Sequence, residues 1–171
     1  MLVLIRFFVD MLLHRRGPAE LPNSRFLLWS LVLLGACVEL GSLLLRVNVA
    51  LSGAIVIVTT LLDLAFVWSV LHAFGLHRRF VQTMIAMAGT NTIINVLYVP
   101  ITLASKESAA TQSGALFWAS VQILFVLWAI DVAGFVLARS LERPYAFGVV
   151  IMLGYALLQL SLVSSMIPVF A

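Results

Sequence analysis

The chain has 171 residues, of which 63% are hydrophobic and only 10% are charged, and its mean hydropathy is +1.15. Soluble domains are about 45 to 50% apolar, so this composition excludes an ordinary water-soluble domain. A chain of this length holds about five membrane spans of about 20 residues each, which leaves no room for a separate soluble domain. We therefore expect an all-α integral membrane protein in contact with the lipid bilayer.

The distribution of positive charge and the single cysteine exclude several further kinds of binding site. The net charge is +3, but the ten basic residues are scattered over short connecting segments instead of clustering with exposed aromatic residues, so we expect no nucleic-acid partner. Cys37 is the only cysteine, which excludes an internal disulfide and a cysteine-rich metal site. We expect no cofactor.

The first 25 residues predict a cytoplasmic interfacial helix followed by a linker with two prolines. Residues 1–13 are apolar apart from Arg6 and Asp10, and these two with His14 stand four residues apart, so a helix gathers them into one polar stripe. An amphipathic helix of this kind lies along a membrane surface. A secretory signal peptide is the alternative, but it needs an uninterrupted apolar region and a small-residue cleavage site, which the charges here deny.

Five apolar runs separated by short polar segments make up the rest of the chain. They predict five transmembrane helices that form one domain over residues 26–171. The third run ends at Pro100, and the polar and small residues of 102–113 then predict an exposed loop. The helices are expected at about residues 26–46, 53–74, 80–101, 116–139 and 145–168.

Lysine and arginine are distributed unequally between the two sides of these helices. Eight fall on the side of the N-terminus and only two, Arg46 and Lys106, fall on the other. The positive-inside rule therefore puts the N-terminus in the cytoplasm and the C-terminus in the periplasm or outside the cell, and we expect a multi-pass protein of a bacterial inner membrane. The expected topology anchors are Arg15, Arg16, Arg78, Arg79, Arg139 and Arg143, and Arg6 and Arg25 complete the set of eight.

Six polar residues inside the expected helices are the candidate functional residues, because polar groups are expensive in a membrane. At about 1.5 Å per residue, four of them fall near the middle of the bilayer, whereas Asp131 falls nearer the cytoplasmic side. Asn91 and Asn95 are four residues apart and so point the same way from their helix. The candidates are Glu39, Asp63, Asn91, Asn95, Asp131 and Gln159.

Basic residues nearby could compensate two of these acids. Arg46 follows Glu39 by seven residues and could reach back toward it along the same helix face. Asp131 could pair with Arg139, eight residues on, or with His72 from the second helix.

Two interpretations of the six polar residues remain open. In the first, Glu39 and Asp63 form a site for a proton or a small cation together with the two asparagine amides, and protonation is coupled to conformation. In the second, the same groups form hydrogen bonds to neighbouring helices and only specify packing or assembly.

The sequence carries none of the common catalytic motifs. It has no His-Glu-x-x-His, no Gly-x-Ser-x-Gly turn and no phosphate-binding glycine loop, so we expect a protein that is not an enzyme. His14, His72 and His77 fall at the expected membrane edges, where a solvated imidazole needs no catalytic explanation.

Small residues in the first span indicate how such a protein could act. They thin the helix so that another helix can approach closely, and they are Gly35, Ala36, Cys37, Gly41 and Ser42. We expect a membrane module that forms a homo-oligomer or binds partner membrane proteins. The alternative is a small proton- or cation-linked transporter or channel that uses the intramembrane carboxylates.

Three short stretches, together with the five closely spaced spans and the prolines before the first span, resemble a known family. The stretches are Phe80-Val81-Gln82-Thr83, Leu127-Trp128-Ala129-Ile130-Asp131 and Ala146-Phe147-Gly148. The pattern is similar to that of the bacterial branch of the Yip family, membrane proteins named for Ypt/Rab interaction in eukaryotes. The resemblance implies a five-span helical protein that works through partners or by shaping membrane. The eukaryotic Asp-Leu-Tyr-Gly-Pro motif is absent, so GTPase binding is not implied.

Overall fold

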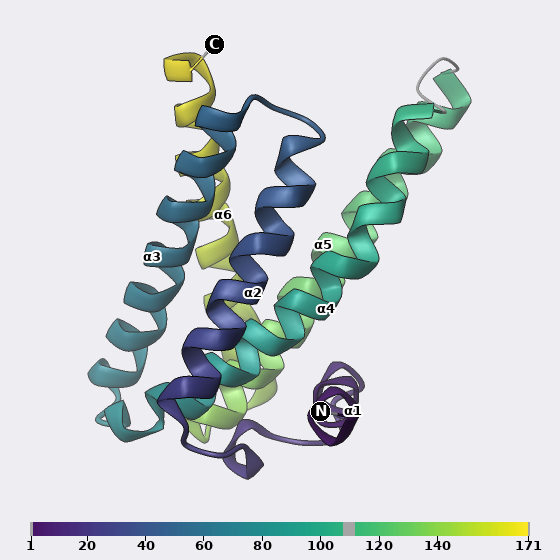
Figure 1. The fold of residues 1–171 in the computed structure, drawn as a ribbon. Coiled ribbons are helices and arrows are strands. Elements are labelled where there is room, and N and C mark those ends of the chain that lie inside the picture. The colour runs from purple at the N-terminus through teal and green to yellow at the C-terminus, as the bar shows by residue number, and fades with distance from the viewer. Residues whose placement is uncertain (1, 108–111, 171) are drawn as a thin grey trace.

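The computed structural model describes residues 2–107 and 112–170, with side chains over 4–105 and 114–166. Within the described backbone there are six α-helices, two short 3-10 turns and no strand (Figure 1). The elements are α1 (Leu2–Leu12), η1 (Pro18–Glu20), α2 (Arg25–Leu44), α3 (Val49–Ala73), η2 (His77–Arg79), α4 (Phe80–Glu107), α5 (Gln112–Leu141) and α6 (Tyr145–Phe170). The expected all-helical architecture is confirmed, and five of these helices are long and apolar enough to cross a membrane.

The five long helices run alternately up and down through the bundle (Figure 1). Helices α2, α3 and α6 gather on one side. Helices α4 and α5 diverge from them at the end of the bundle where the C-terminus lies. Helix α4 is central, since it packs against α1, α2, α3 and α5, while α6 packs against α5 and α3. Buried apolar side chains such as Leu71, Ile85 and Leu137 concentrate where α3 and α5 end and α4 begins.

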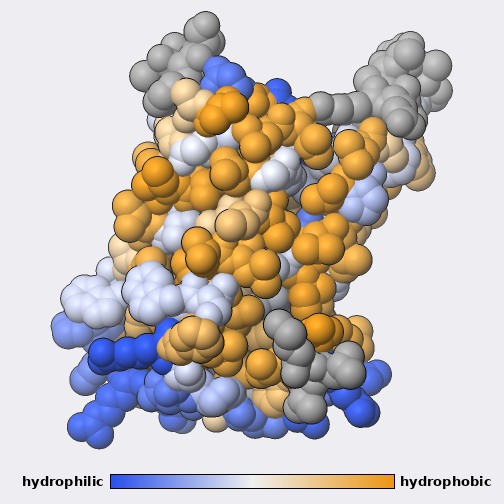
Figure 2. Space-filling view, viewed as in Figure 1, coloured by the Kyte–Doolittle hydropathy of each residue, from blue (hydrophilic) through white to orange (hydrophobic). Residues whose placement is uncertain are grey.

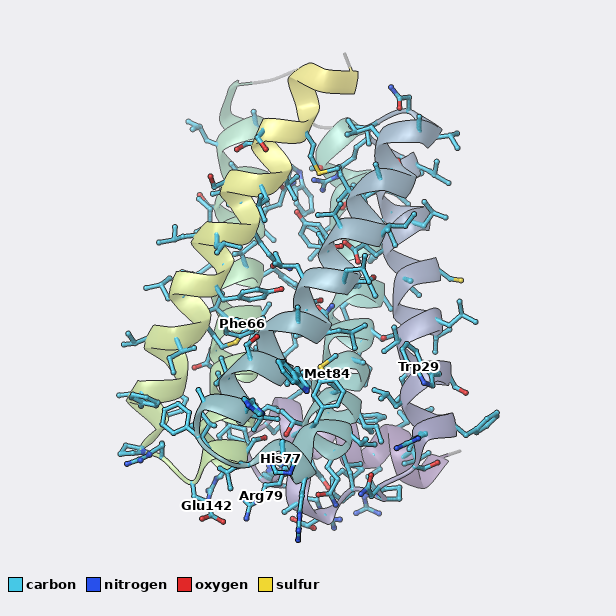
Figure 3. The ribbon with its side chains drawn as sticks, turned by 90° about the vertical axis from the view of Figure 1, so that its left-hand side faces the viewer. Trp29, Phe66, His77, Arg79, Met84 and Glu142 are labelled. Atoms are coloured by element: carbon cyan, nitrogen blue, oxygen red, sulfur yellow. The ribbon has the colours of Figure 1, made fainter. Side chains whose placement is uncertain are left out.

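Most of the positive charge lies at this same end of the bundle, which we call the basic end. Figure 2 shows it as a blue rim below a broad orange belt of apolar side chains. Arg79 donates hydrogen bonds there to the Glu142 carboxylate and to the Ser140 carbonyl, and Figure 3 shows Arg79 and Glu142 close together. All six expected topology anchors belong to segments that meet at the basic end. The side of a membrane that this end would face stays a prediction.

Helix α1 lies across the basic end instead of running along the bundle (Figure 1). Phe8 and Met11 are buried, and the Phe8 ring fills the space beside Gly89 of α4, where an added Cβ would lie 2.3 Å from it. Ile5 and Leu13 are more than half exposed, so α1 keeps a second apolar face away from the bundle. The expected N-terminal helix is confirmed, while its position at a membrane surface stays a prediction.

Three helices end at the basic end with the same backbone motif. A residue one or two positions past the helix end has a positive φ in each case: 57° at His14, 71° at Gly75 and 56° at Glu142. The next amide then bonds back five residues, as in the 2.8 Å bond from Arg15 N to Asp10 O. Glycine is usual at this position because a side chain there costs about 1 to 2 kcal/mol. His14 and Glu142 hold the conformation nonetheless, and both side chains contact another helix.

The expected loop over 102–113 is wrong for most of its length. Helix α4 continues through Pro100 to Glu107, and α5 already begins at Gln112; only 108–111 lie outside the described residues. The Thr102 side chain is buried, and its hydroxyl donates to the Tyr98 carbonyl and accepts from Arg46 at 2.8 Å. Short polar side chains satisfied in this way are compatible with a helix, which their composition alone does not reveal.

Candidate functional site

Five polar side chains from three helices meet in the middle of the apolar segment, and we call them the acidic cluster. Helix α3 contributes two of them four residues apart, which puts both on one face, and α6 contributes a second pair with the same spacing. Helix α2 contributes one. The members are Glu39 of α2, Thr59 and Asp63 of α3, and Tyr155 and Gln159 of α6.

Three hydrogen bonds within the cluster are accepted by the two carboxylates, and a fourth runs from Gln159 Nε2 to the Tyr155 hydroxyl at 3.1 Å. Thr59 Oγ1 donates to Glu39 Oε1 at 3.2 Å, and this hydroxyl is also 2.9 Å from the Ile55 carbonyl of its own helix. Asp63 Oδ1 accepts from the Tyr155 hydroxyl and, at 3.1 Å, from Gln159 Nε2. Asp63 is thus tied to α6 and Glu39 to α3, so the two acids connect three helices.

The Tyr155 ring is held in place by aromatic stacking as well as by its hydroxyl. It stacks on Phe66 of α3 with ring centroids 3.9 Å apart and planes inclined by 16°. Phe66 lies between α3 and α6 in Figure 3. Phe66 follows Asp63 by three residues, so one face of α3 supplies both contacts to Tyr155.

The acidic cluster contains no basic partner. Among the side chains that the structure describes, no lysine, arginine or histidine forms an ion pair with Glu39 or Asp63. The same part of the chain has no group of three or more histidine, cysteine and acidic residues that could hold a metal ion. Two carboxyl groups in an apolar segment without a counter-ion suit either uptake of a proton or hydrogen bonding that joins helices.

The structure brings together only part of the predicted polar set. Glu39, Asp63 and Gln159 lie in the acidic cluster, whereas no hydrogen bond among the described residues joins Asn91 or Asn95 to it, and Asn91 is exposed. Sequence reasoning missed Tyr155 and Thr59. Each lies four residues before a predicted member, so helical spacing was a usable signal for both.

Arg46 does not reach back to Glu39. Its Nη2 instead donates to Thr102 Oγ1 at 2.8 Å and to the Tyr98 hydroxyl at 3.2 Å, and its guanidinium lies over the Tyr98 ring. Arg46 therefore joins the end of α2 to α4 and leaves the acidic cluster uncompensated.

A second polar group surrounds a cavity of about 630 Å³ at the basic end, which we call the basic-end cavity. It lies between the residue that closes α1, the second half of α5 and the start of α6. Its lining residues are His14, Asp131, Phe135, Ala138, Arg139, Arg143 and Tyr145.

A close crossing of α5 and α6 positions two of these residues. A Cβ on Gly134 would lie 2.8 Å from the Val149 Cα, and one on Gly148 would lie 2.2 Å from the Gly134 carbonyl oxygen, so the backbones almost touch. Asp131 precedes Gly134 by three residues, and Tyr145 precedes Gly148 by three. The crossing therefore turns both side chains toward the same place.

Asp131 contacts two partners in the basic-end cavity. It accepts a hydrogen bond from the Tyr145 hydroxyl, and its Oδ2 lies 3.3 Å from His14 Nε2, which is shielded from solvent and forms no aligned hydrogen bond. Two partners are expected for Asp131 from the sequence, Arg139 and His72, and the structure contradicts both. Arg139 lies over the Phe135 ring at 5.4 Å, and His72 stacks on a tryptophan of its own helix.

Comparisons with protein-family models, with curated proteins and with solved structures give no match to this chain. The resemblance to the Yip family stays a prediction. The function has to be inferred from the two polar groups and from the outer surface of the bundle.

One face of α2 is exposed along most of its length and carries small residues at its centre. Ser30, Leu34, Cys37 and Gly41 are exposed at spacings of four, three and four residues, which puts them on one face of the helix. A Cβ on Gly41 would meet no atom within 4 Å. On the opposite face Gly35 packs against α4, where a Cβ would lie 3.0 Å from a threonine hydroxyl. This outer α2 face has no partner among the described residues.

Proposed function

We propose that the chain is a multi-pass membrane protein that acts by assembly and not by catalysis, and that it self-associates through the outer α2 face. The five long apolar helices and the basic end support a location in a bacterial inner membrane, with the basic end and the N-terminus in the cytoplasm. Membership of the Yip family, whose resemblance implies work through partners, is compatible with this proposal. The observation that supports self-association most directly is the exposed pair of small residues, Cys37 and Gly41, on α2.

Helix association in lipid favours a surface of this kind. Lipid tails are as apolar as leucine, so helices gain little from burying apolar area, and small residues that allow close backbone contact supply the stabilisation instead. Cys37 and Gly41 are four residues apart and form such a pair. Of the five long helices, α2 buries the smallest share of its span inside the bundle, 6%. A second copy of α2 would cover this face.

Cross-linking through Cys37, the only cysteine, tests the proposal directly. In isolated membranes a short bis-maleimide should link two chains at Cys37, and Cys37→Ser serves as the blank. Gly41→Leu places a bulky side chain in the contact and should reduce the cross-linked dimer at least about fivefold. Gly154→Leu is the matched control, because Gly154 of α6 also has no atom within 4 Å.

Two results would contradict self-association through α2. One is a monomer in detergent and in nanodiscs with no cross-linked dimer. The other is an equal loss of dimer in Gly41→Leu and Gly154→Leu. A cross-link that joins Cys37 to a different membrane protein would replace the homo-oligomer with a partner complex.

A second candidate function is proton- or cation-linked transport, which the acidic cluster favours. Glu39 and Asp63 lie in adjacent helices of an apolar segment without a basic partner. Proteoliposomes should then show a flux that depends on a pH gradient and that Asp63→Asn abolishes. Asp131→Asn is the control, since it removes an acid outside the cluster. Wild-type flux no greater than that of empty liposomes would eliminate this candidate.

A further inference from the structure

The basic-end cavity carries positive charge that the protein does not neutralise. Within the part of the chain whose side chains are described, neither Arg139 nor Arg143 forms an ion pair. Their guanidinium groups rest on aromatic rings instead, Arg139 on Phe135 at 5.4 Å and Arg143 on Phe74 at 5.5 Å. Arg79, nearby but outside this cavity, is paired with an acid.

The acid in the cavity does not cancel these charges. Asp131 is engaged by His14 at 3.3 Å and by the Tyr145 hydroxyl. Among the described side chains it forms no ion pair with an arginine. The lining has two arginines and only this one acid, so it carries more positive than negative charge.

The lining also includes an apolar wall beside the two exposed arginines. Phe135 and Ala138 are buried and form this wall, and the Arg139 guanidinium lies over the Phe135 ring. The volume, about 630 Å³, is within the range of sites that hold small organic ligands. A ligand that fits has an anionic group for the arginines and a less polar part for the wall.

We propose that the basic-end cavity binds the phosphate group of an anionic phospholipid. Guanidinium groups form two parallel hydrogen bonds with phosphate oxygens, so Arg139 and Arg143 are the phosphate ligands, and the Phe135 wall contacts the glycerol and the first acyl carbons. A lipid is favoured over a soluble phosphate because buried apolar side chains, Phe135 and Ala138, line the cavity together with the arginines of the basic end. This inference rests on the membrane location proposed above but not on association through α2.

Lipid-dependent thermal stability of the purified full-length protein tests the inference. In a neutral detergent, short-chain phosphatidylglycerol should raise the unfolding midpoint in a saturable way, because a ligand of the native state stabilises it, and phosphatidylcholine should not. The double variant Arg139→Gln/Arg143→Gln should weaken phosphatidylglycerol binding at least about tenfold. Arg25→Gln/Arg78→Gln removes the same charge from exposed basic-end positions and should change binding by less than about twofold.

A charge-conserving variant guards against a folding defect in the glutamine pair. Arg139→Lys/Arg143→Lys keeps the positive charge but loses the planar fork, so binding should weaken by several-fold while the unfolding midpoint without lipid stays near that of the wild type. Lysine variants that bind as tightly as the wild type would overturn the assignment of these arginines as bidentate phosphate ligands.

Four further outcomes would overturn the proposal or the membrane location on which it rests. If inorganic phosphate and glycerol 3-phosphate stabilise the protein at the same concentrations as phosphatidylglycerol, the ligand is a soluble phosphate and the lipid proposal fails. If both glutamine pairs weaken binding equally, the effect is diffuse surface charge and the cavity is not the site. If alkaline carbonate extracts the protein from membranes, the membrane location proposed above fails together with the lipid site. If the protein stays in the membrane but phosphatidylglycerol does not stabilise it, only the lipid site fails.

Discussion

Gly148 of α6 lies against the backbone of Gly134 in α5, so closely that a Cβ on Gly148 would be 2.2 Å from the Gly134 carbonyl oxygen. This contact fixes the α5–α6 pair and with it the positions of Asp131 and Tyr145. Backbone atoms cannot move aside as a side chain can, so the crossing depends on glycine at this position.

Gly148→Ala should therefore lower the free energy of unfolding by about 1 to 3 kcal/mol, the usual effect of overpacking. Thermal unfolding in detergent micelles measures the change. Gly154→Ala is the control on the same helix, because nothing lies within 4 Å of that position. Alanine there should leave stability equal or raise it by about 0.5 to 1 kcal/mol through helix propensity. Equal losses in the two variants would show that the crossing is not tight.

Tyr155→Phe tests the acidic cluster without removing the aromatic ring. The Phe66 stack at 3.9 Å stays, but Asp63 loses the tyrosine hydroxyl and keeps only Gln159. We expect unfolding to become easier by about 1 to 3 kcal/mol, since a partly buried acceptor loses a donor. Tyr98→Phe is the control, because its hydroxyl accepts an exposed hydrogen bond from Arg46, and it should cost less than about 1 kcal/mol. A larger loss of stability in Tyr98→Phe than in Tyr155→Phe would contradict the stabilising role of the acidic cluster.

Gly89→Leu should undock α1. The added side chain would occupy the space of the Phe8 ring, which lies 2.3 Å from an ideal Cβ at this position. With α1 displaced, the exposed Arg15 and Arg16 should be cleaved by trypsin several-fold faster, because cleavage follows the population of locally opened states. Gly53→Leu, at a position with no atom within 4 Å, should leave the cleavage rate unchanged. An unchanged rate in Gly89→Leu would show that α1 is held by other contacts.

The sequence predicts how deep a residue lies along its helix. It does not predict which way the residue faces around the helix axis. Depth placed Glu39, Asp63 and Gln159 at one level, and the structure joins the last two directly. Depth says nothing about which way a residue faces. Depth puts Asn91 at the same level, yet Asn91 is exposed, and no hydrogen bond among the described residues joins it to the cluster.

Contacts made by α1 could not be predicted from local pattern. His14 reaches Asp131 only because Phe8 docks on Gly89 and the chain turns at a positive φ, and both features come from packing between segments far apart in sequence. The helix from Thr102 to Glu107 was missed for a different reason. Its polar composition is typical of a loop, and only the contact from Arg46 shows that this turn of α4 is packed.

Two helix ends with the same backbone motif differ in the residue that adopts the left-handed conformation. Glu142 has φ 56° and Gly75 has φ 71°, but only Glu142 carries a side chain, which is paired with Arg79 on the surface. Left-handed backbone costs a side chain about 1 to 2 kcal/mol, whereas an exposed ion pair contributes about 0 to 1 kcal/mol. Glu142→Gly should thus leave the free energy of unfolding unchanged or raise it by about 1 kcal/mol, while Gly75→Ala should lower it by about 1 kcal/mol. Denaturant unfolding of both variants measures the difference, and a clear loss in Glu142→Gly would mean that the Arg79 pair outweighs the backbone strain.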